Sequence, residues 1–164
     1  MEKENKLKFE ILLNRNKTTW EIDKSVNPIF ISDLIIENAE FIKMEYIELE
    51  GNNITFKDCL FQESYLSGSI FRFNSRFDNC IFINSKMSKT IFEGNISNCK
   101  FINCDFFKTE LNGSTISNSI FVNCDFSSVS LCFLKLMKTQ FLYSKNLNVD
   151  SKKNNEEDDV LWYP

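Results

Sequence analysis

The sequence predicts an all-β solenoid, a chain wound into stacked coils with four short sides. Large apolar residues recur at every fifth position through most of the chain, and similar hexapeptides such as 80–85 and 99–104 recur about every four pentapeptides. Helices and strands have side-chain periods of 3.6 and 2.0, so neither explains a period of five. A square coil with one pentapeptide on each side explains both periods and places equivalent residues about 4.8 Å apart.

Each pentapeptide supplies a large and a small residue that we expect to point into the coil. The large column holds Ile36, Phe41, Tyr46, Phe56, Phe61, Leu66, Phe71, Phe77, Phe82, Met87, Phe92, Ile96, Phe101, Phe106, Leu111, Ile116, Phe121, Phe126, Leu131, Leu136 and Phe141. Two residues before most of these stands a small residue, usually Ser, Thr, Cys, Ala or Gly. The period slips by one residue between Phe71 and Phe77 and slips back between Phe92 and Ile96.

The six cysteines favour a structural role. Cys59, Cys80, Cys99, Cys104 and Cys124 occupy the small inward column, where a free thiol acts as a compact hydrophobe. In a reducing compartment we expect these thiols to stay reduced. Cys132 follows Leu131 and is expected to point outward, either as a reactive thiol or as a surface cysteine without function.

The composition argues against catalysis and against binding to polyanions. The chain has no His, which excludes Ser-His-Asp and Cys-His arrangements and histidine-containing zinc sites. Its four Gly residues are isolated, so no phosphate-binding loop is present. A net charge of −4 gives no general attraction to nucleic acid or an anionic membrane. We therefore expect a non-enzymatic protein without cofactor or metal that does not bind nucleic acid directly.

Both ends depart from the five-residue pattern, which divides the chain into three parts. Residues 1–33 contain strand-like runs at 7–13 and 18–22 and are expected to cap the first coil. Residues 34–145 form the repeat region, and residues 146–164 form an acidic and aromatic tail. The charged stretch 152–159 is expected to be mobile, whereas Leu161, Trp162 and Tyr163 either fold back as a second cap or dock into a partner. No segment suits a signal peptide or a spanning helix, which favours a soluble, cytoplasmic protein.

One outer face is expected to be apolar. Because four pentapeptides make a coil, every fourth repeat projects its outward residues onto the same face. Around five of the Phe residues this face carries Leu60, Ile81, Ile83, Ile102, Ile120, Val122 and Leu142, with Asn84, Asn103 and Asn123 beside them as a predicted amide ladder. β-Branched residues also favour strand positions and stand singly on many surfaces. Seven in one column nevertheless indicate a face covered by a second subunit, a partner protein or the N-terminal segment.

Acidic residues concentrate at the ends of the chain. Residues 33–50 carry six acids against Lys43, while residues 51–150 carry ten basic and eight acidic residues. The acidic candidates for partner binding are Glu37, Glu40, Glu45, Glu48, Glu50, Glu156, Glu157, Asp158 and Asp159.

The repeated order of a small residue, often Asp or Asn, then Leu or Phe and two variable residues resembles the pentapeptide-repeat family over residues 34–145. The resemblance implies a right-handed quadrilateral β-helix of about five to six coils with terminal caps. The best-known members resemble duplex DNA and bind type II topoisomerases such as gyrase, as in the Qnr and MfpA groups and in self-immunity to microcin and albicidin.

Two functions follow from these observations. The resemblance implies a DNA-mimicking modulator or protector of a type II topoisomerase, although the body of the solenoid carries +2 and no long acidic column. The alternative is an adaptor, inhibitor or immunity protein that binds another protein through the apolar face or the C-terminal tail.

Overall fold

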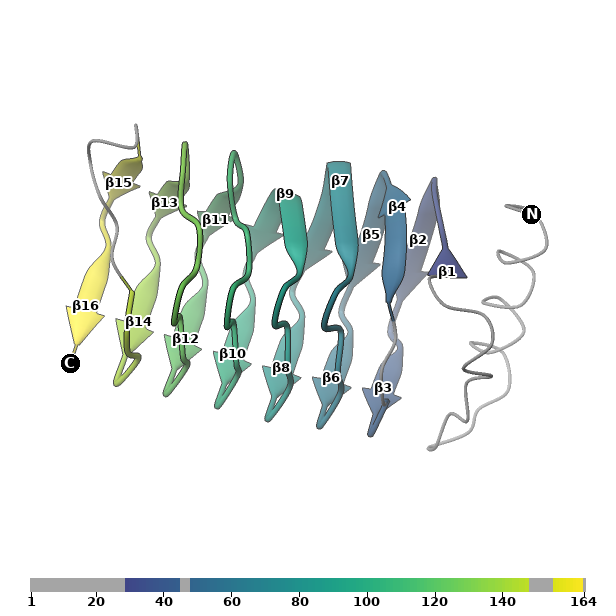
Figure 1. Cartoon of the computed structure of the whole chain (residues 1–164), viewed down its shortest axis with the longest axis horizontal. Helices are drawn as coiled ribbons and strands as arrows, with labels where there is room; N and C mark the ends of the chain where they lie inside the picture. The colour runs from purple at the N-terminus through teal and green to yellow at the C-terminus, as the bar shows by residue number, and fades with distance from the viewer. Residues whose placement is uncertain (1–28, 45–47, 148–154, 164) are drawn as a thin grey trace.

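The computed structural model describes residues 29–44, 48–147 and 155–163, and within them the chain forms stacked coils without a helix (Figure 1). Each coil has four sides, which we number in chain order beginning with the side that carries β2. Side 1 carries β2 (Leu34–Glu37), side 2 carries β3 (Glu40–Ile42) and side 4 carries β1 (Ile29–Phe30). Side 3 is built from isolated parallel bridges that link Tyr65, Lys86, Asp105, Asp125 and Lys145. The strand-like runs expected at 7–13 and 18–22, and Tyr46 of the large column, lie outside the described residues.

Side 2 is the most regular. Its parallel sheet holds one strand per coil, namely β3, β6 (Leu60–Gln62), β8 (Ile81–Ile83), β10 (Lys100–Ile102), β12 (Ile120–Val122), β14 (Gln140–Leu142) and β16 (Leu161–Tyr163). Six intervals separate these seven strands, so the chain completes six turns between β3 and β16. The predicted β-solenoid is confirmed.

A nine-stranded parallel sheet covers sides 4 and 1. Besides β1 and β2 it contains β4 (Leu49–Asn52), β5 (Ile54–Lys57), β7 (Ile70–Asp78), β9 (Ile91–Ser97), β11 (Thr115–Ser117), β13 (Lys135–Met137) and β15 (Glu156–Asp158). Strands β7 and β9 run from side 4 into side 1, so each forms one long strand through a corner (Figure 1).

The large column forms the core, as predicted. On side 2 the rings of Phe41, Phe61, Phe82, Phe101, Phe121, Phe141 and Trp162 stack with centroid distances between 4.4 and 4.8 Å and interplanar angles of 10° or less. We call this set the aromatic ladder. A coil spacing near 4.8 Å brings equivalent rings into contact, and stacked rings contribute beyond their buried area. Each ring of the aromatic ladder is therefore stabilised by the equivalent rings of the neighbouring coils.

The small column is polar for a structural reason. Its hydroxyls donate to the carbonyl of a large residue in the preceding coil, as from Ser64 Oγ to Phe41 O at 2.8 Å and from Thr109 Oγ1 to Met87 O at 2.7 Å. The five cysteines of this column are buried and free, and Cys59 Sγ lies 3.4 Å from Ile36 O. The hydrogen bond with Cys80, together with burial, raises the pKa of Cys59 well above its usual range. Small donors satisfy buried carbonyls where a larger side chain does not fit.

The many Asn residues also have a structural reason. The chain turns most corners through a residue with positive φ, usually two places after the large residue. Eight of these residues are Asn, with φ between 47° and 56°: Asn38, Asn53, Asn79, Asn84, Asn98, Asn103, Asn118 and Asn123. Asn adopts this left-handed conformation more readily than most residues. The need for positive φ at the corners thus accounts for the many Asn residues of the chain.

The C-terminal segment extends the solenoid past residue 145. Strand β15 pairs with β13, and β16 pairs with β14, so both sheets gain a last strand. Lys135 Nζ lies 2.7 Å from Glu156 Oε2, and the Trp162 ring stacks on Phe141 at 4.4 Å. Of the two alternatives for the tail, the structure supports folding back over the last coil.

Candidate binding surfaces

The predicted apolar residues all lie on side 2, but they occupy two columns instead of one. Residues before and after each core aromatic both point outward, on separate lines. The line after the aromatic contains Ile83, Ile102, Val122 and Leu142 in consecutive register and ends at Tyr163. We call these five residues the apolar strip.

The line before the aromatic is interrupted. Leu60 and Ile81 are adjacent in register, but Lys100 separates them from Ile120, and Gln140 follows. Ile81 is 37% exposed, whereas Leu60 and Ile120 are half-buried. The continuous part of the apolar face is therefore the apolar strip, whose first four members are also half-buried.

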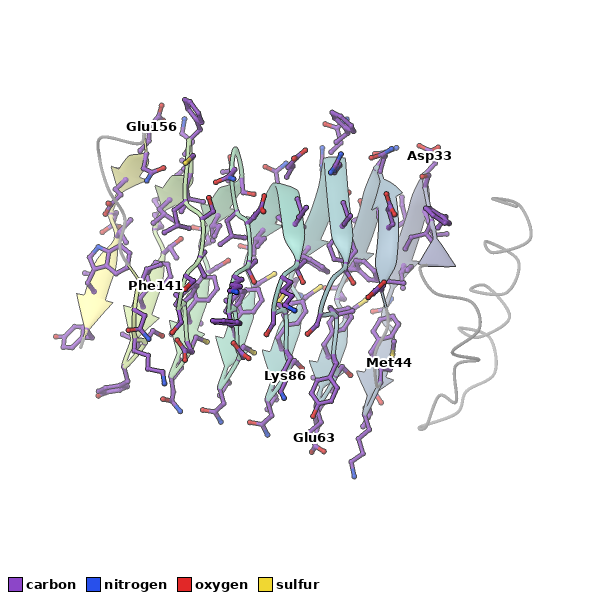
Figure 2. All side chains as sticks on the ribbon, in the orientation of Figure 1. Asp33, Met44, Glu63, Lys86, Phe141 and Glu156 are labelled. Carbon is purple, nitrogen blue, oxygen red and sulfur yellow. The ribbon has the colours of Figure 1, made fainter. Side chains whose placement is uncertain are left out.

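An amide ladder borders the apolar strip, as the sequence predicted. Asn103 Nδ2 donates to Asn84 Oδ1 at 3.0 Å, and Asn123 Nδ2 donates to Asn103 Oδ1 at 2.9 Å. Glu63 stands at the equivalent corner, and it projects from the edge of the stack opposite Asp33 (Figure 2). The strip thus has a polar margin whose groups are already hydrogen-bonded to one another.

The structure does not collect the acidic candidates into one column. Glu37 lies on side 1 with Lys57 Nζ 3.3 Å away, Glu40 lies on side 2, and Glu50 lies on side 4. Glu48 precedes β4, and Glu45 is outside the described residues. At the other end Glu156, Glu157 and Asp158 form β15, and Asp159 follows at a corner. The acids of the first coils therefore encircle one end of the solenoid, six turns from those of β15.

The last coil leaves its aromatic residues partly open. Leu161, Trp162 and Tyr163 of β16 are 46%, 42% and 61% exposed, although Trp162 stacks on Phe141. Trp162 Nε1 lies 3.3 Å from Glu157 Oε2.

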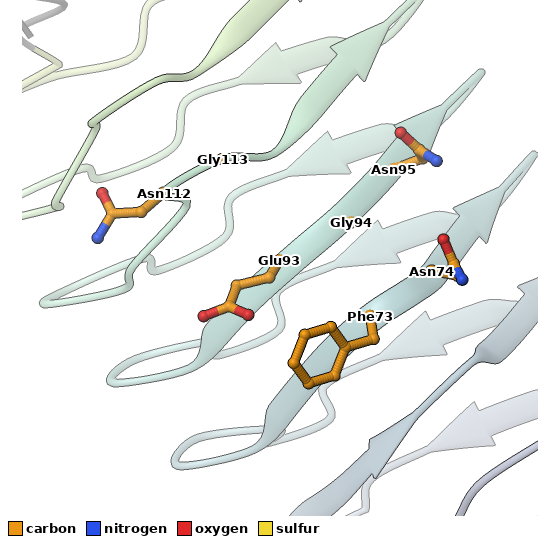
Figure 3. Close-up of a pocket in the computed structure, with 7 residues that line it drawn as sticks. All are labelled: Phe73, Asn74, Glu93, Gly94, Asn95, Asn112 and Gly113. Atoms are coloured by element: carbon orange, nitrogen blue, oxygen red, sulfur yellow. The ribbon is translucent and has the colours of Figure 1, made fainter.

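A notch on side 4 was not predicted as a site. Between Phe71 and Ser75, strand β7 has three residues where β9 has only Glu93 between Phe92 and Gly94. Phe73 and Asn74 accommodate the excess with φ of 37° and 63°. The notch is a cavity of about 350 Å³ lined by Phe73, Asn74, Glu93, Gly94, Asn95, Asn112 and Gly113 (Figure 3). In the sequence, the one-residue slip of the five-residue period after Phe71 marks the position of the notch.

Gly94 makes the notch possible. A Cβ at this position would lie 2.1 Å from Ser75 O, so no other residue fits without a shift of the backbone. Two strands thereby approach closely just where β7 carries its extra residues. Among the described residues no group of three or more Cys, Asp or Glu is placed to hold a metal ion. Nor does the described part of the chain contain a helix long and apolar enough to cross a membrane.

Comparison with known proteins agrees with this geometry. Residues 95–132 match the family model for pentapeptide repeats, with eight copies. This chain contains pentapeptide repeats. The family match begins where the second slip of the period ends, and from there the five-residue period runs without interruption. No curated protein matches the sequence significantly.

Solved structures of pentapeptide-repeat solenoids are similar at low identity. QnrB1, a plasmid-mediated fluoroquinolone resistance protein, is 13% identical over 77% of each chain, with a TM-score of 0.33. HetL of Nostoc sp. strain PCC 7120, a protein involved in the regulation of heterocyst differentiation, is 9% identical over 69% of this chain and 62% of HetL, with a TM-score of 0.41. Rfr23 of Cyanothece 51142 is 10% identical over 81% of this chain and 86% of Rfr23, with a TM-score of 0.27.

Proposed function

We propose that this pentapeptide-repeat protein is a non-enzymatic binding module, an adaptor, inhibitor or immunity protein, that docks another protein on the apolar strip of side 2. The observation that carries the proposal is the consecutive register of Ile83, Ile102, Val122 and Leu142. Contiguous apolar surface is uncommon on monomers and marks interaction sites. An apolar centre with a polar margin is also the usual layout of a protein interface.

The sheet of side 2 suits a flat partner surface. Its backbone groups are paired from coil to coil, so the strip offers side chains and not an open strand edge. Because the first four side chains of the strip are already half-buried, they lose little rotamer freedom when a partner covers them. A second copy of the chain is one such partner.

A DNA-mimicking modulator of a type II topoisomerase is the second candidate, as the family resemblance implies. The acidic residues of the first coils and of β15 support it, because they give both ends of the solenoid negative charge. The central coils offer no acidic column to imitate a phosphate backbone. Such a role would therefore depend on the two ends.

Two strip substitutions test the first candidate. Replacing Ile102 and Val122 with Glu places two charges at the centre of the strip, and we expect capture of protein partners to fall at least about tenfold. The matched control replaces Ser117 and Met137 with Glu, because these residues occupy the same line on side 1 and are adjacent in register. Quantitative pulldown and light scattering compare partner capture and oligomeric state, with the melting temperature as a check on folding. Unchanged partner capture and oligomeric state in a folded strip variant would overturn the proposal.

A supercoiling assay tests the second candidate, the topoisomerase role. If the full chain neither inhibits gyrase nor protects it from a quinolone, the topoisomerase role is removed. Cytoplasmic location is part of the proposal, and the free buried thiols support it because reducing compartments preserve them.

A further inference from the structure

The notch on side 4 combines backbone strain with an exposed aromatic ring. Phe73 and Asn74 are consecutive non-glycine residues with positive φ, and Phe73 is 66% exposed. Such conformations carry an energetic cost and cluster at functional sites. Bulges likewise re-aim side chains next to binding sites. The notch therefore carries this cost at two consecutive residues, where a regular corner carries it at one.

Among the described residues, three of the seven that line the notch offer side-chain acceptors without partners, whereas Asn112 Oδ1 already accepts from Ser130 Oγ and Cys132 N. Glu93 is its single ionised group, and no basic group of the described residues lies within 4.0 Å of the Glu93 carboxylate. Within the described part of the chain, the side chains of Asn74 and Asn95 also make no hydrogen bond. Figure 3 shows Phe73 and Glu93 on one flank of the notch, with Asn74 and Asn95 on the other.

We propose that the notch binds the guanidinium group of an arginine side chain carried by a protein or peptide. A guanidinium is planar and stacks on an aromatic face, here that of Phe73. It also presents five N–H donors, of which a carboxylate takes two side by side, and Glu93 supplies that carboxylate.

The charge near the notch has one opposing contribution. Arg72 precedes Phe73 and lines a second depression of about 190 Å³ with Glu50 and Asn52. Phe73 borders both depressions. A cationic ligand is therefore attracted by Glu93 and repelled by Arg72, which predicts opposite effects when each charge is removed.

The inference rests on the proposed function only in that a protein partner supplies the arginine. Side 4 is opposite side 2, so the notch would be a second contact, independent of the apolar strip. For that reason a small probe tests the notch without any partner.

The probe is Nα-acetyl-argininamide, titrated into the isotope-labelled full chain and followed by backbone amide NMR. We expect saturable shifts confined to the residues that line the notch, with a dissociation constant in the millimolar range. Phe73→Ala and Glu93→Gln should each weaken binding at least about tenfold, whereas Arg72→Gln should strengthen it about twofold to fivefold.

The matched control is Phe133→Ala. Phe133 occupies the same corner of side 4 three coils later, is 63% exposed and has φ of 57°, but it does not line the notch. We expect this variant to bind the probe as the unsubstituted chain does. The strip variant with Glu at 102 and 122 should also bind it normally, so failure of the notch and failure of the strip are distinguishable.

Three outcomes would overturn the inference. The first is the absence of saturable shifts, and the second is unchanged binding in a folded Glu93→Gln variant. The third is tighter binding of a neutral methyl glucoside at the same amides, which would make the notch a saccharide site. Weaker binding of Nα-acetyl-lysinamide than of the arginine probe would support the planar guanidinium over a point charge.

Discussion

Sides 2 and 4 are built from the same pentapeptide, but only side 2 repeats without interruption. Its aromatic ladder stacks every ring on the next from Phe41 to Trp162. On side 4 Phe71 and Phe92 are 6.0 Å apart and tilted by 59°, and Phe92 instead stacks on Phe77 of side 1 at 5.3 Å. Exact repetition builds the core, whereas the interruption creates a strained surface with unpaired acceptors.

The largest expected effect is the loss of a ring from the aromatic ladder. Phe101 is fully buried and stacks at 4.6 Å on both Phe82 and Phe121. Phe101→Ala should lower the free energy of unfolding by about 3–5 kcal/mol, because it leaves a cavity between two coils. Phe133→Ala removes an exposed ring and should cost less than about 0.5 kcal/mol. Urea unfolding measures both, and similar values would contradict the ladder's importance.

At the notch of side 4, Gly94 is the residue that we expect to be least tolerant of substitution. Gly94→Ala places a methyl group against Ser75 O, so we expect a loss of about 3 kcal/mol from backbone displacement. Gly113→Ala is the control, since nothing lies within 4 Å of the added carbon and only the positive φ of 70° opposes it, at a cost of about 1 kcal/mol. Thermal unfolding ranks the two variants. Equal losses would mean that β7 and β9 adjust freely at the notch.

Sequence periodicity predicted the coil, its inward columns and the amide ladder because each depends on residues in a strict five-residue register. The slip of the period after Phe71 was visible in the sequence too, but the notch that it produces was not. An extra residue can be absorbed in a loop or in the strand, and here β7 stays a strand through the corner, which turns Phe73 outward. The sequence left the last coil open between a second cap and a docking segment, because Glu157 stands in register with Leu136 and the apolar pattern ends before the fold does.

The apolar face illustrates a different limit. All seven predicted residues lie on side 2, yet the five-residue period alone does not separate those before a core aromatic from those after it. Strand geometry separates them, since both neighbours of an inward residue point outward at positions two residues apart. The register then divides the set at Lys100 and leaves the apolar strip continuous.

Thiol reactivity should also differ between the two sides. Cys59, Cys80 and Cys99 are buried within side 2, and the pKa of Cys59 is raised, whereas Cys132 of side 4 is half-buried. Reagents attack thiolates, so Cys132 should be the first of the six to react in the native protein, and unfolding should expose all six. Cys132→Ser should abolish the native reaction with a disulfide reagent. Rapid labelling of a side 2 thiol in the folded chain would show that the ladder opens.

The smallest expected effect concerns an outward hydrogen-bond cluster on side 3, where the coils repeat regularly. Asp125 is partly buried, which opposes ionisation, but Ser127, Asn146 and Lys145 donate to it and hold its pKa well below the usual range. An unfolded Asp titrates near pH 3.9, so the stabilisation is present above about pH 4 and is lost as the pH falls toward the folded pKa. Between pH 5 and pH 2 the unsubstituted chain should therefore lose about 1 kcal/mol more than Asp125→Asn, which has no carboxylate to protonate. Urea unfolding across this pH range measures the difference, and parallel profiles would show that the cluster adds no pH-dependent stability to the regular coils.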